Sequence, residues 1–202
     1  MAGVRRLVSV APRSRFEGTA GSGGELWFMI TGSGRLDTGG RRGATVGRDT
    51  GVWVPPGSGY RLDAGEDVLL DAIALPGGPR APGATAVPRI SALRDCEVER
   101  TGDRRFRVLL GPGRGCEAAT QFVGEIPPGR APEHSHPYDE MVLVLNGEGV
   151  AHVRGGADRA LAPGTRLHLP PGRPHCLENT GPGLLVVLGV FHPGGSPAQK
   201  EN

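Results

Sequence analysis

The second half of the chain carries four side chains of the types that bind transition metals. The segment GRAPEHSHPYDEMVLVLNG (129–147) supplies His134, His136 and Glu140, and the segment GTRLHLPPGRPHCLEN (164–179) supplies His175. Three neutral imidazoles and one carboxylate form a ligand set suited to a divalent first-row metal. All six histidines of the chain lie in this half, so any metal-based function is expected to reside there.

The spacing of these residues allows them to meet in one cavity. Residues i and i+2 of a strand face the same side, so His134 and His136 can point inward together. Glu140 opens the next apolar run, and His175 follows a rigid Pro-Pro-Gly turn. Four protein ligands in an octahedral shell leave two positions open for water, dioxygen or a chelating substrate. We therefore predict a metal centre built from these four residues.

The elements that must position the ligands are short apolar runs separated by turn residues. The chain has 202 residues, and its 35 glycines and 19 prolines punctuate the apolar runs instead of forming tracts. No long stretch has a helical period, and many short runs between turns are typical of a β-sandwich or barrel. We therefore expect an all-β fold.

Two parts of the chain repeat each other. ELWFMITG (25–32) matches EMVLVLNG (140–147), since each is a glutamate that leads an apolar run into a glycine, and a run ending in Pro-Pro-Gly follows in both copies. By the same offsets Tyr60 takes the place of His175, and the other two histidines have no counterpart. A carboxylate alone holds a transition metal poorly, so the first copy is expected to be metal-free.

The repeat predicts two β modules, at residues 1–78 and 104–192. The Pro-, Gly- and Ala-rich segment 79–103 between them is expected to be a linker, with a short helical turn possible at Ile90 to Asp95. Residues 193–202 are expected to form a flexible tail.

The two ligand-bearing segments resemble the motifs of the cupin superfamily. The first motif, G-x5-H-x-H-x3/4-E-x6-G, fits residues 129–147 with one residue fewer before the first histidine, and the second, G-x5-P-x-G-x2-H-x3-N, fits residues 164–179 without a gap. The resemblance implies a bicupin of the double-stranded β-helix (jelly-roll) type, with two β-barrels and the metal in the second. A degenerate, metal-free first barrel would serve as packing scaffold, pocket wall or dimer contact.

Further residues are candidates for roles around the metal. Glu140 is a candidate proton shuttle as well as a ligand, and Tyr138 is a candidate proton donor or acceptor, with an exposed loop tyrosine as the alternative. Gln121, Arg130 and His152 are candidates for substrate binding. The alternatives for these three are an outward-facing strand residue, a surface arginine and a half-buried histidine.

Two other features bear on the site. We expect Arg104, Arg105 and Arg107 at a solvated strand edge, with contact of one of them to an anionic substrate as the alternative. Cys176 adjoins His175, and strand alternation predicts that it faces away from the metal.

The resemblance implies a metal-dependent enzyme acting on a small molecule. The leading hypothesis is a mononuclear non-haem Fe(II)-type dioxygenase or oxidoreductase, with Zn, Mn, Ni, Co or Cu as other possible metals. The alternatives are a redox-neutral Zn(II) or Mn(II) isomerase, cyclase, lyase or bond-rearranging enzyme, and a non-enzymatic protein that binds a small molecule.

Charge and cysteine usage narrow the class of partner. The net charge is +2, and no basic stripe with interleaved aromatics is present, so we expect no nucleic-acid partner. No run approaches the roughly 20 apolar residues of a membrane span. Three widely spaced cysteines indicate a reduced, cytoplasmic setting. A small-molecule substrate and a homodimer are the expected partners.

Overall fold

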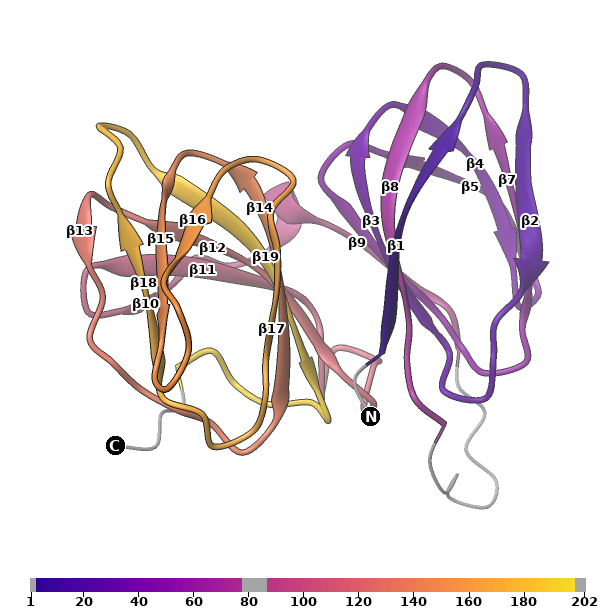
Figure 1. Cartoon of the computed structure of the whole chain (residues 1–202). Helices are drawn as coiled ribbons and strands as arrows, with labels where there is room; N and C mark the ends of the chain where they lie inside the picture. Colours follow the sequence, from indigo (N-terminus) through magenta and orange to yellow (C-terminus); the bar gives the residue numbers. More distant parts are fainter. Residues whose placement is uncertain (1–2, 78–86, 199–202) are drawn as a thin grey trace. The chain divides into compact units, whose positions relative to one another are not determined.

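A computed structural model of the chain describes residues 3–77 and 87–198, and it confirms the all-β expectation (Figure 1). Two compact units are present. The first is Met1–Cys96 with Gly113–Cys116, and the second is Glu97–Pro112 with Glu117–Asn202. Within the described residues, one 3-10 turn, η1 (Leu93–Asp95), is the only helical element.

The first unit has two antiparallel sheets around an apolar core. One sheet has the order β1 (Val4–Val10), β8 (Val68–Ala74), β3 (Glu25–Thr31), β6 (Thr50–Val54) and β9 (Arg89–Ala92). The other has the order β2 (Arg15–Thr19), β7 (Gly59–Ala64), β4 (Ser33–Thr38) and β5 (Arg41–Gly47). Both sheets contribute fully buried side chains to the core, among them Trp27, Leu36, Leu62 and Leu70.

The second unit is built in the same way. Its larger sheet has the order β10 (Glu99–Thr101), β11 (Arg104–Leu110), β12 (Thr120–Ile126), β19 (Leu185–His192), β14 (Asp139–Asn146) and β17 (Arg166–Leu169). Its smaller sheet has the order β13 (Gly129–Arg130), β18 (His175–Asn179), β15 (Gly149–Val153) and β16 (Arg159–Leu161). The core again draws on both sheets, for example through Val142, Ala151 and Leu169.

The internal repeat is confirmed at the level of strand register. Glu25 of β3 lies opposite Val54 of β6, and Glu140 of β14 lies opposite Leu169 of β17. Val54 and Leu169 each directly precede Pro-Pro-Gly. β3 and β14 also share a register shift at the same offset from their glutamates. The two glutamates are therefore structurally equivalent positions.

Gly147, which follows β14, shows why the repeat keeps a glycine after this strand. Its φ is +87°, and a Cβ would lie 2.6 Å from the carbonyl oxygen of Leu184. Both the backbone conformation and the space exclude a side chain, so glycine is required at this turn.

The predicted linker is wrong for most of its described part. Arg89–Ala92 forms β9 and pairs with β6, and Glu99–Thr101 forms β10 and pairs with β11. The helical turn predicted at 90–95 is present only as η1. Short strands in a segment dominated by turn residues carry little sequence signal, because tertiary pairing decides them. Residues 79–86 of the predicted linker lie outside the described residues.

The predicted flexible tail also differs from the structure over residues 193–198. The Thr120 hydroxyl donates to the carbonyl oxygen of Gly195 (2.7 Å), and the N–H of Gly195 donates back to that hydroxyl oxygen (3.1 Å). The Tyr138 hydroxyl donates to the carbonyl oxygen of Ser196 (2.9 Å). This segment is thus tied to the second unit, and the remaining four residues lie outside the described part.

Two further findings concern the predicted cellular setting. In the described part of the chain, no helix has the length and apolar character to span a membrane. Cys96, Cys116 and Cys176 are all buried, and none of them forms a disulfide.

Candidate metal centre

Backbone hydrogen bonds bring the two ligand-bearing segments side by side. The N–H of His134 donates to the carbonyl of His175 (3.0 Å), and the N–H of His175 donates to the carbonyl of His134 (2.9 Å). The N–H of Gly172, whose φ is +68°, donates to the carbonyl of His136 (2.8 Å). The Pro-Pro-Gly turn and the His-x-His segment therefore hold each other in position.

Each of the three imidazoles has its Nδ1 atom beside a backbone carbonyl oxygen. The partners are Pro132 for His134 (3.1 Å), Tyr138 for His136 (3.0 Å) and Arg173 for His175 (2.8 Å), each through its carbonyl. A carbonyl oxygen only accepts, so Nδ1 must carry the proton in all three rings. In the neutral form, each ring then offers the lone pair of Nε2 to a metal.

The three rings lie close enough to share one ion. One ligand atom from each of His134, His136 and His175 falls within 4.8 Å of the others. Two nitrogens bound at about 2.0–2.1 Å to one ion lie at most ~4.2 Å apart. Nitrogens in adjacent positions of an octahedral shell lie only about 3 Å apart, so the rings would draw closer together on binding an ion, a shift that side-chain rotation supplies.

Glu140 places its carboxylate beside these rings. Its Oε2 lies 2.8 Å from Nε2 of His136 and 3.5 Å from Nε2 of His175. Burial alone would raise the pKa of Glu140, but hydrogen bonds and charge interactions with the two imidazoles outweigh it and lower the pKa to about 2. The carboxylate is therefore ionised at neutral pH and is available as a fourth ligand.

The contact between His136 and Glu140 is the feature that best fits a metal ion. Since Nδ1 of His136 carries a proton, a neutral ring would present the Nε2 lone pair to the carboxylate at 2.8 Å. Two lone pairs at that distance repel unless a proton or a cation lies between them. The donor set of three imidazoles and one carboxylate suits a divalent transition metal in that place.

His134 and His136 have pKa values shifted in opposite directions. Burial is the main cause that lowers the pKa of His134 from 6.5 to about 4. Burial also acts to lower the pKa of His136, but the hydrogen bond to Glu140 and its charge outweigh burial and raise that pKa. At neutral pH, protons therefore compete with a metal for His136 and hardly at all for His134.

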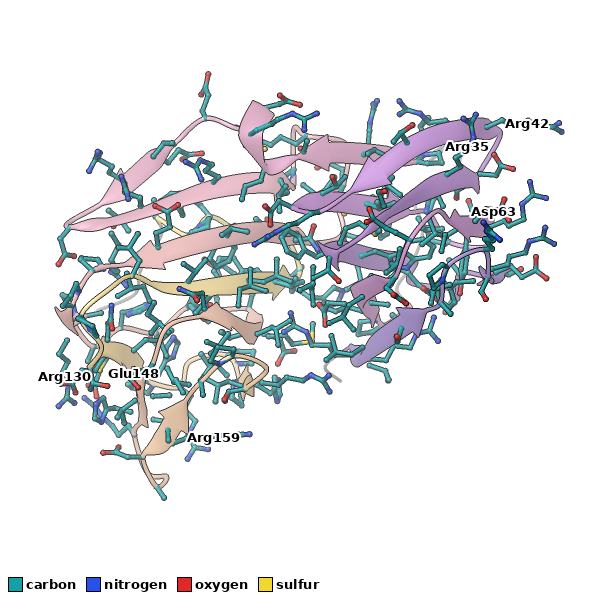
Figure 2. All side chains as sticks on the ribbon, turned by 90° about the horizontal axis from the view of Figure 1, so that it is seen from above. Arg35, Arg42, Asp63, Arg130, Glu148 and Arg159 are labelled. Atoms are coloured by element: carbon teal, nitrogen blue, oxygen red, sulfur yellow. The ribbon has the colours of Figure 1, made fainter. Side chains whose placement is uncertain are left out.

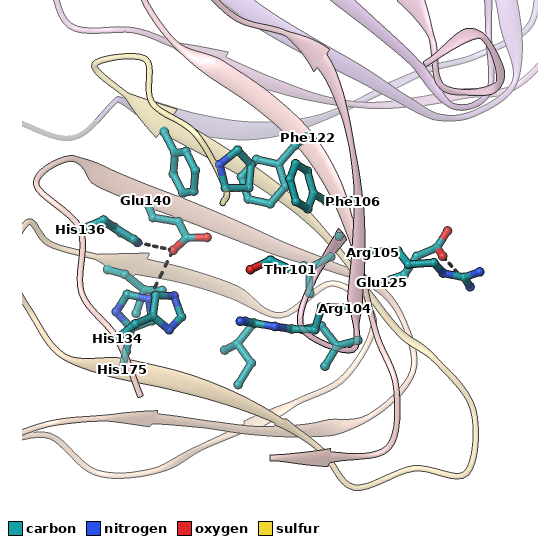
Figure 3. Close-up of a pocket in the computed structure, with 17 residues that line it drawn as sticks. Thr101, Arg104, Arg105, Phe106, Phe122, Glu125, His134, His136, Glu140 and His175 are labelled. Carbon is teal, nitrogen blue, oxygen red and sulfur yellow. Dashed lines mark hydrogen bonds and ion pairs between the residues drawn. The ribbon is translucent and has the colours of Figure 1, made fainter. Parts of the chain in front are cut away.

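The site opens into a small cavity of about 80 Å³ in the second unit (Figure 3). Its apolar wall includes Phe106, Phe122 and Phe191, and the four candidate ligands form a polar wall. One water needs roughly 10–15 Å³ of such volume, so the cavity has room for about five to eight waters or a small organic molecule.

Arg104 is a cavity residue whose role the sequence did not single out. It comes from the start of β11, and Figure 3 shows its guanidinium directed toward His134 and His175. Arg104 was expected at a solvated strand edge, and this expectation is wrong. Its position agrees with the alternative, in which one of the three arginines reaches the site. The available signal was strand alternation, which places Arg104 on the same face as Phe106.

Arg105 and Arg107 remain partly exposed, as expected, but Arg105 lies in a paired part of β11 and also lines the cavity. Both pair with Glu125, at 2.9 Å from Arg105 and 3.2 Å from Arg107. In Figure 3 the paired Arg105 and Glu125 lie away from the histidines.

The three predicted substrate-binding residues do not line the cavity. Gln121 is fully buried, but β12 turns Phe122 and Gly124 toward the cavity and Gln121 to the opposite face. Arg130 is exposed at the outer edge of its unit, where its Nε lies 3.4 Å from the sulfur of Cys176 (Figure 2). Strand register is the reason that neither residue lines the cavity. The sequence left the register open for Gln121, and the register also decides the outward position of Arg130.

His152 was a candidate for substrate binding and Tyr138 a candidate proton donor or acceptor, but both side chains bond to other protein groups. His152 lies between two carboxylates, with Nδ1 at 2.9 Å from Asp158 and Nε2 at 2.8 Å from Glu178. Tyr138 is buried and stacks on His136, with ring centroids 4.7 Å apart and an interplanar angle of 11°. Its hydroxyl bonds to the carbonyl of Ser196 and does not line the cavity, so Tyr138 positions His136 and is not placed to transfer a proton there.

Two other motif residues have clear structural places. Cys176 is buried and neighbours Arg130, whereas the adjacent His175 lines the cavity, so the predicted outward orientation of the thiol is confirmed. Asn179 donates to the carbonyls of Ile126 (2.8 Å) and Gly183 (2.7 Å), so it anchors the end of β18 and does not contact the site.

The equivalent position of the first unit is occupied by protein groups. The Glu25 carboxylate accepts from the indole N–H of Trp27 (2.9 Å) and lies 3.3 Å from a guanidinium nitrogen of Arg6. The same nitrogen of Arg6 lies 3.3 Å from the hydroxyl of Tyr60, which holds the place of His175. A guanidinium, not a set of imidazoles, thus faces the carboxylate in this unit.

Comparison with known proteins assigns a fold to this arrangement. Residues 122–191 match the family model described as "Cupin domain", which covers the site and most of the second unit. Among curated proteins, no match is found.

Solved structures of the cupin fold resemble nearly the whole chain. An oxalate decarboxylase superposes with a TM-score of 0.78 at 17% identity, over 96% of this chain and 70% of its own. A structure of Bacillus subtilis oxalate decarboxylase concerned with its Mn(II) centres has a TM-score of 0.74 at 17% identity, over 96% and 74%. A candidate glyoxylate-induced protein from Pseudomonas aeruginosa has a TM-score of 0.80 at 15% identity, over 96% and 76%. At these identities the similarity establishes the fold alone.

Proposed function

We propose that this protein is a metal-dependent cupin enzyme that acts on a small molecule in the cavity of the second unit. One divalent transition ion would bind through His134, His136, His175 and Glu140. The observation that carries the proposal is the set of three Nδ1-anchored imidazoles, whose ligand atoms lie within 4.8 Å of one another beside an ionised, buried carboxylate.

We further propose a bicupin whose first barrel is degenerate. The shared sheet order and the equivalent registers of Glu25 and Glu140 support a duplication. The guanidinium of Arg6 beside Glu25 supports a first barrel that works without a metal, because a cation already compensates the carboxylate. Its role would be that of a scaffold or of a dimer contact.

Each residue group of the second unit has a distinct task in this proposal. A bound divalent metal would supply Lewis-acid chemistry, and redox chemistry if it is manganese or iron. Glu140 would hold or move a proton at its Oε2 atom, which lies 2.8 Å from Nε2 of His136. The aromatic wall of Phe106, Phe122 and Phe191 would exclude bulk water and strengthen the polar interactions inside.

Manganese and iron are the two metals that we propose for this site. The ligand set suits both ions, and the Mn(II) centres named for the Bacillus subtilis protein support manganese as strongly as the resemblance supports iron. The size of the cavity favours a substrate of a few non-hydrogen atoms over large aromatic substrates. Dioxygenation and decarboxylation of a small acid are the two candidate reactions, the second supported by the oxalate decarboxylase neighbours.

Reconstitution of the metal-free protein separates these reactions. Samples loaded with Mn(II), Fe(II), Co(II), Ni(II), Cu(II) or Zn(II) are assayed by elemental analysis, oxygen uptake and release of carbon dioxide from small acids. Oxygen consumed in step with product supports the dioxygenase. Turnover that persists with Zn(II) under anaerobic conditions removes it, and a protein that retains no metal under any condition overturns the proposed function.

A further inference from the structure

Two arginines line this cavity, and Arg105 pairs with Glu125, whereas Arg104 is used neither by an ion pair nor by the proposed metal chemistry. Strand alternation puts Arg104 on the inward face of β11 together with Phe106, and both line the cavity. The guanidinium points toward the candidate metal ligands (Figure 3). Its position at the cavity wall opposite a ring of imidazoles therefore calls for a separate explanation.

Within the described part of the chain, Arg104 is recorded in no hydrogen bond or ion pair, and the charges of Asp103 and Glu140 attract it over a longer distance. Its Nε atom is buried without a hydrogen bond, whereas Arg105 and Arg107 on the other face both pair with Glu125. Glu140 is not its hydrogen-bond partner, because that carboxylate is engaged by His136 and His175. A buried donor on a charged group is costly unless something accepts from it, so the missing acceptor is expected from outside the chain.

We propose that Arg104 is the substrate-recognition residue of the cavity and that the substrate is a small carboxylate. This inference rests on the proposed metal-dependent function and narrows it to a substrate class. A guanidinium offers a planar fork of N–H donors that matches the two oxygens of a carboxylate. One end of the anion would be held by Arg104, which leaves its other end directed at the metal-ligand cluster.

Charge and size both support a small carboxylate. Arg105 and Glu125 of the cavity lining compensate each other, so a bound divalent ion and Arg104 would face only the Glu140 carboxylate, and an additional anion would balance the site. The cavity of about 80 Å³ admits roughly the volume of five to eight waters, which suits an acid of a few non-hydrogen atoms.

Binding measurements on four proteins test this inference: wild type, Arg104→Gln, Arg104→Lys and the matched control Arg107→Gln. Each is prepared metal-free and loaded with Zn(II), which is redox-silent. Acetate and oxalate are titrated by calorimetry, with acetamide and oxamide as uncharged analogues of similar shape and inorganic phosphate as a second anion. Metal content and thermal unfolding are recorded for every sample.

The expected result is a selective loss of carboxylate affinity. Arg104→Gln should weaken oxalate binding by about 10- to 100-fold, the range for losing hydrogen bonds to a charged group. Arg104→Lys should retain part of the affinity, and Arg107→Gln should stay within about twofold of wild type. Binding of the amides should not depend on Arg104.

Several outcomes would overturn the inference. Wild-type protein that binds no carboxylate, or that binds phosphate in preference, contradicts the substrate class. Equal affinity in wild type and Arg104→Gln, with normal zinc content, refutes Arg104 while the metal centre stands. Conversely, the wild-type protein could take up no metal and still bind carboxylate, with that binding lost in the metal-free Arg104→Gln variant. This outcome would refute the proposed function and support the anion site.

Discussion

Replacement of His175 by glutamine is expected to remove the metal and with it the metal-dependent part of the stability. His175 is buried and contributes one of three ring nitrogens within 4.8 Å of one another. Changes in the groups that merely orient metal ligands cost about 10- to 100-fold in affinity. Loss of a ligand itself should therefore weaken metal binding by at least about 100-fold.

The size of the effect on stability follows from linkage. When the free metal concentration is 100 times the dissociation constant, binding stabilises the folded state by about 2.7 kcal/mol. A 100-fold weaker site gains only about 0.4 kcal/mol at the same concentration, so the variant lacks ~2.3 kcal/mol. For a chain of this size, 1 kcal/mol shifts Tm by roughly 2–4 °C, which predicts a difference of about 5–9 °C in the metal-induced shift.

The assay is thermal unfolding with and without metal, together with elemental analysis after desalting. His168→Gln is the matched control, because His168 belongs to the neighbouring β17, is exposed and pairs with Asp139 at 2.7 Å outside the cluster. The control should show the metal-induced shift of the wild-type protein. Unchanged metal content and an unchanged shift in His175→Gln would refute the assignment of the site.

Three further predictions concern other groups of the second unit. In metal-free protein, NMR titration should give His134 a pKa near 4 and His136 a pKa above 6.5. Because the pKa of His134 is lowered in the folded state, the unfolded chain takes up that proton first as the pH falls. The associated stability is therefore present above pH 6.5 and lost as the pH falls toward 4. A His134 resonance that titrates near 6.5 would contradict its burial. Tyr138→Phe should cost ~1 kcal/mol in denaturant unfolding through loss of the bond to the Ser196 carbonyl, with metal content retained; a loss of metal would show that the hydroxyl has a direct role at the site. Gly147→Ala should destabilise by about 1–3 kcal/mol, because its positive φ and the nearby carbonyl of Leu184 exclude a Cβ, and a neutral effect in chemical denaturation would argue against the turn.

The sequence was most informative where a residue's role follows from local geometry. The i, i+2 spacing of His134 and His136 brought both rings to one side, as strand periodicity requires. The Pro-Pro-Gly turns located the equivalent registers of Glu25 and Glu140, which the sheet pairing confirms. These features depend on a few neighbouring residues and one backbone conformation, so they can be read from spacing.

Predictions that depended on strand register or on distant pairing succeeded less often. The sequence left open which face of its strand Gln121 occupies, and the register turns it away from the cavity. Arg104 was grouped with two edge arginines, although alternation separates it from Arg105 and Arg107. Arg89–Ala92 was assigned to a linker, although pairing with β6 makes it a strand.

The amino-acid sequence by itself determined the chemical nature of the candidate site: three imidazoles and a carboxylate, set in an all-β framework. Residue type and short-range spacing are enough for that, because they fix which donors exist and which face of a strand they share. The tertiary structure alone decided the tautomer of each ring, through carbonyls such as those of Pro132 and Arg173, and the placement of Arg104 in the cavity wall. Those features arise from strands that are distant along the chain and meet only when the sheets close.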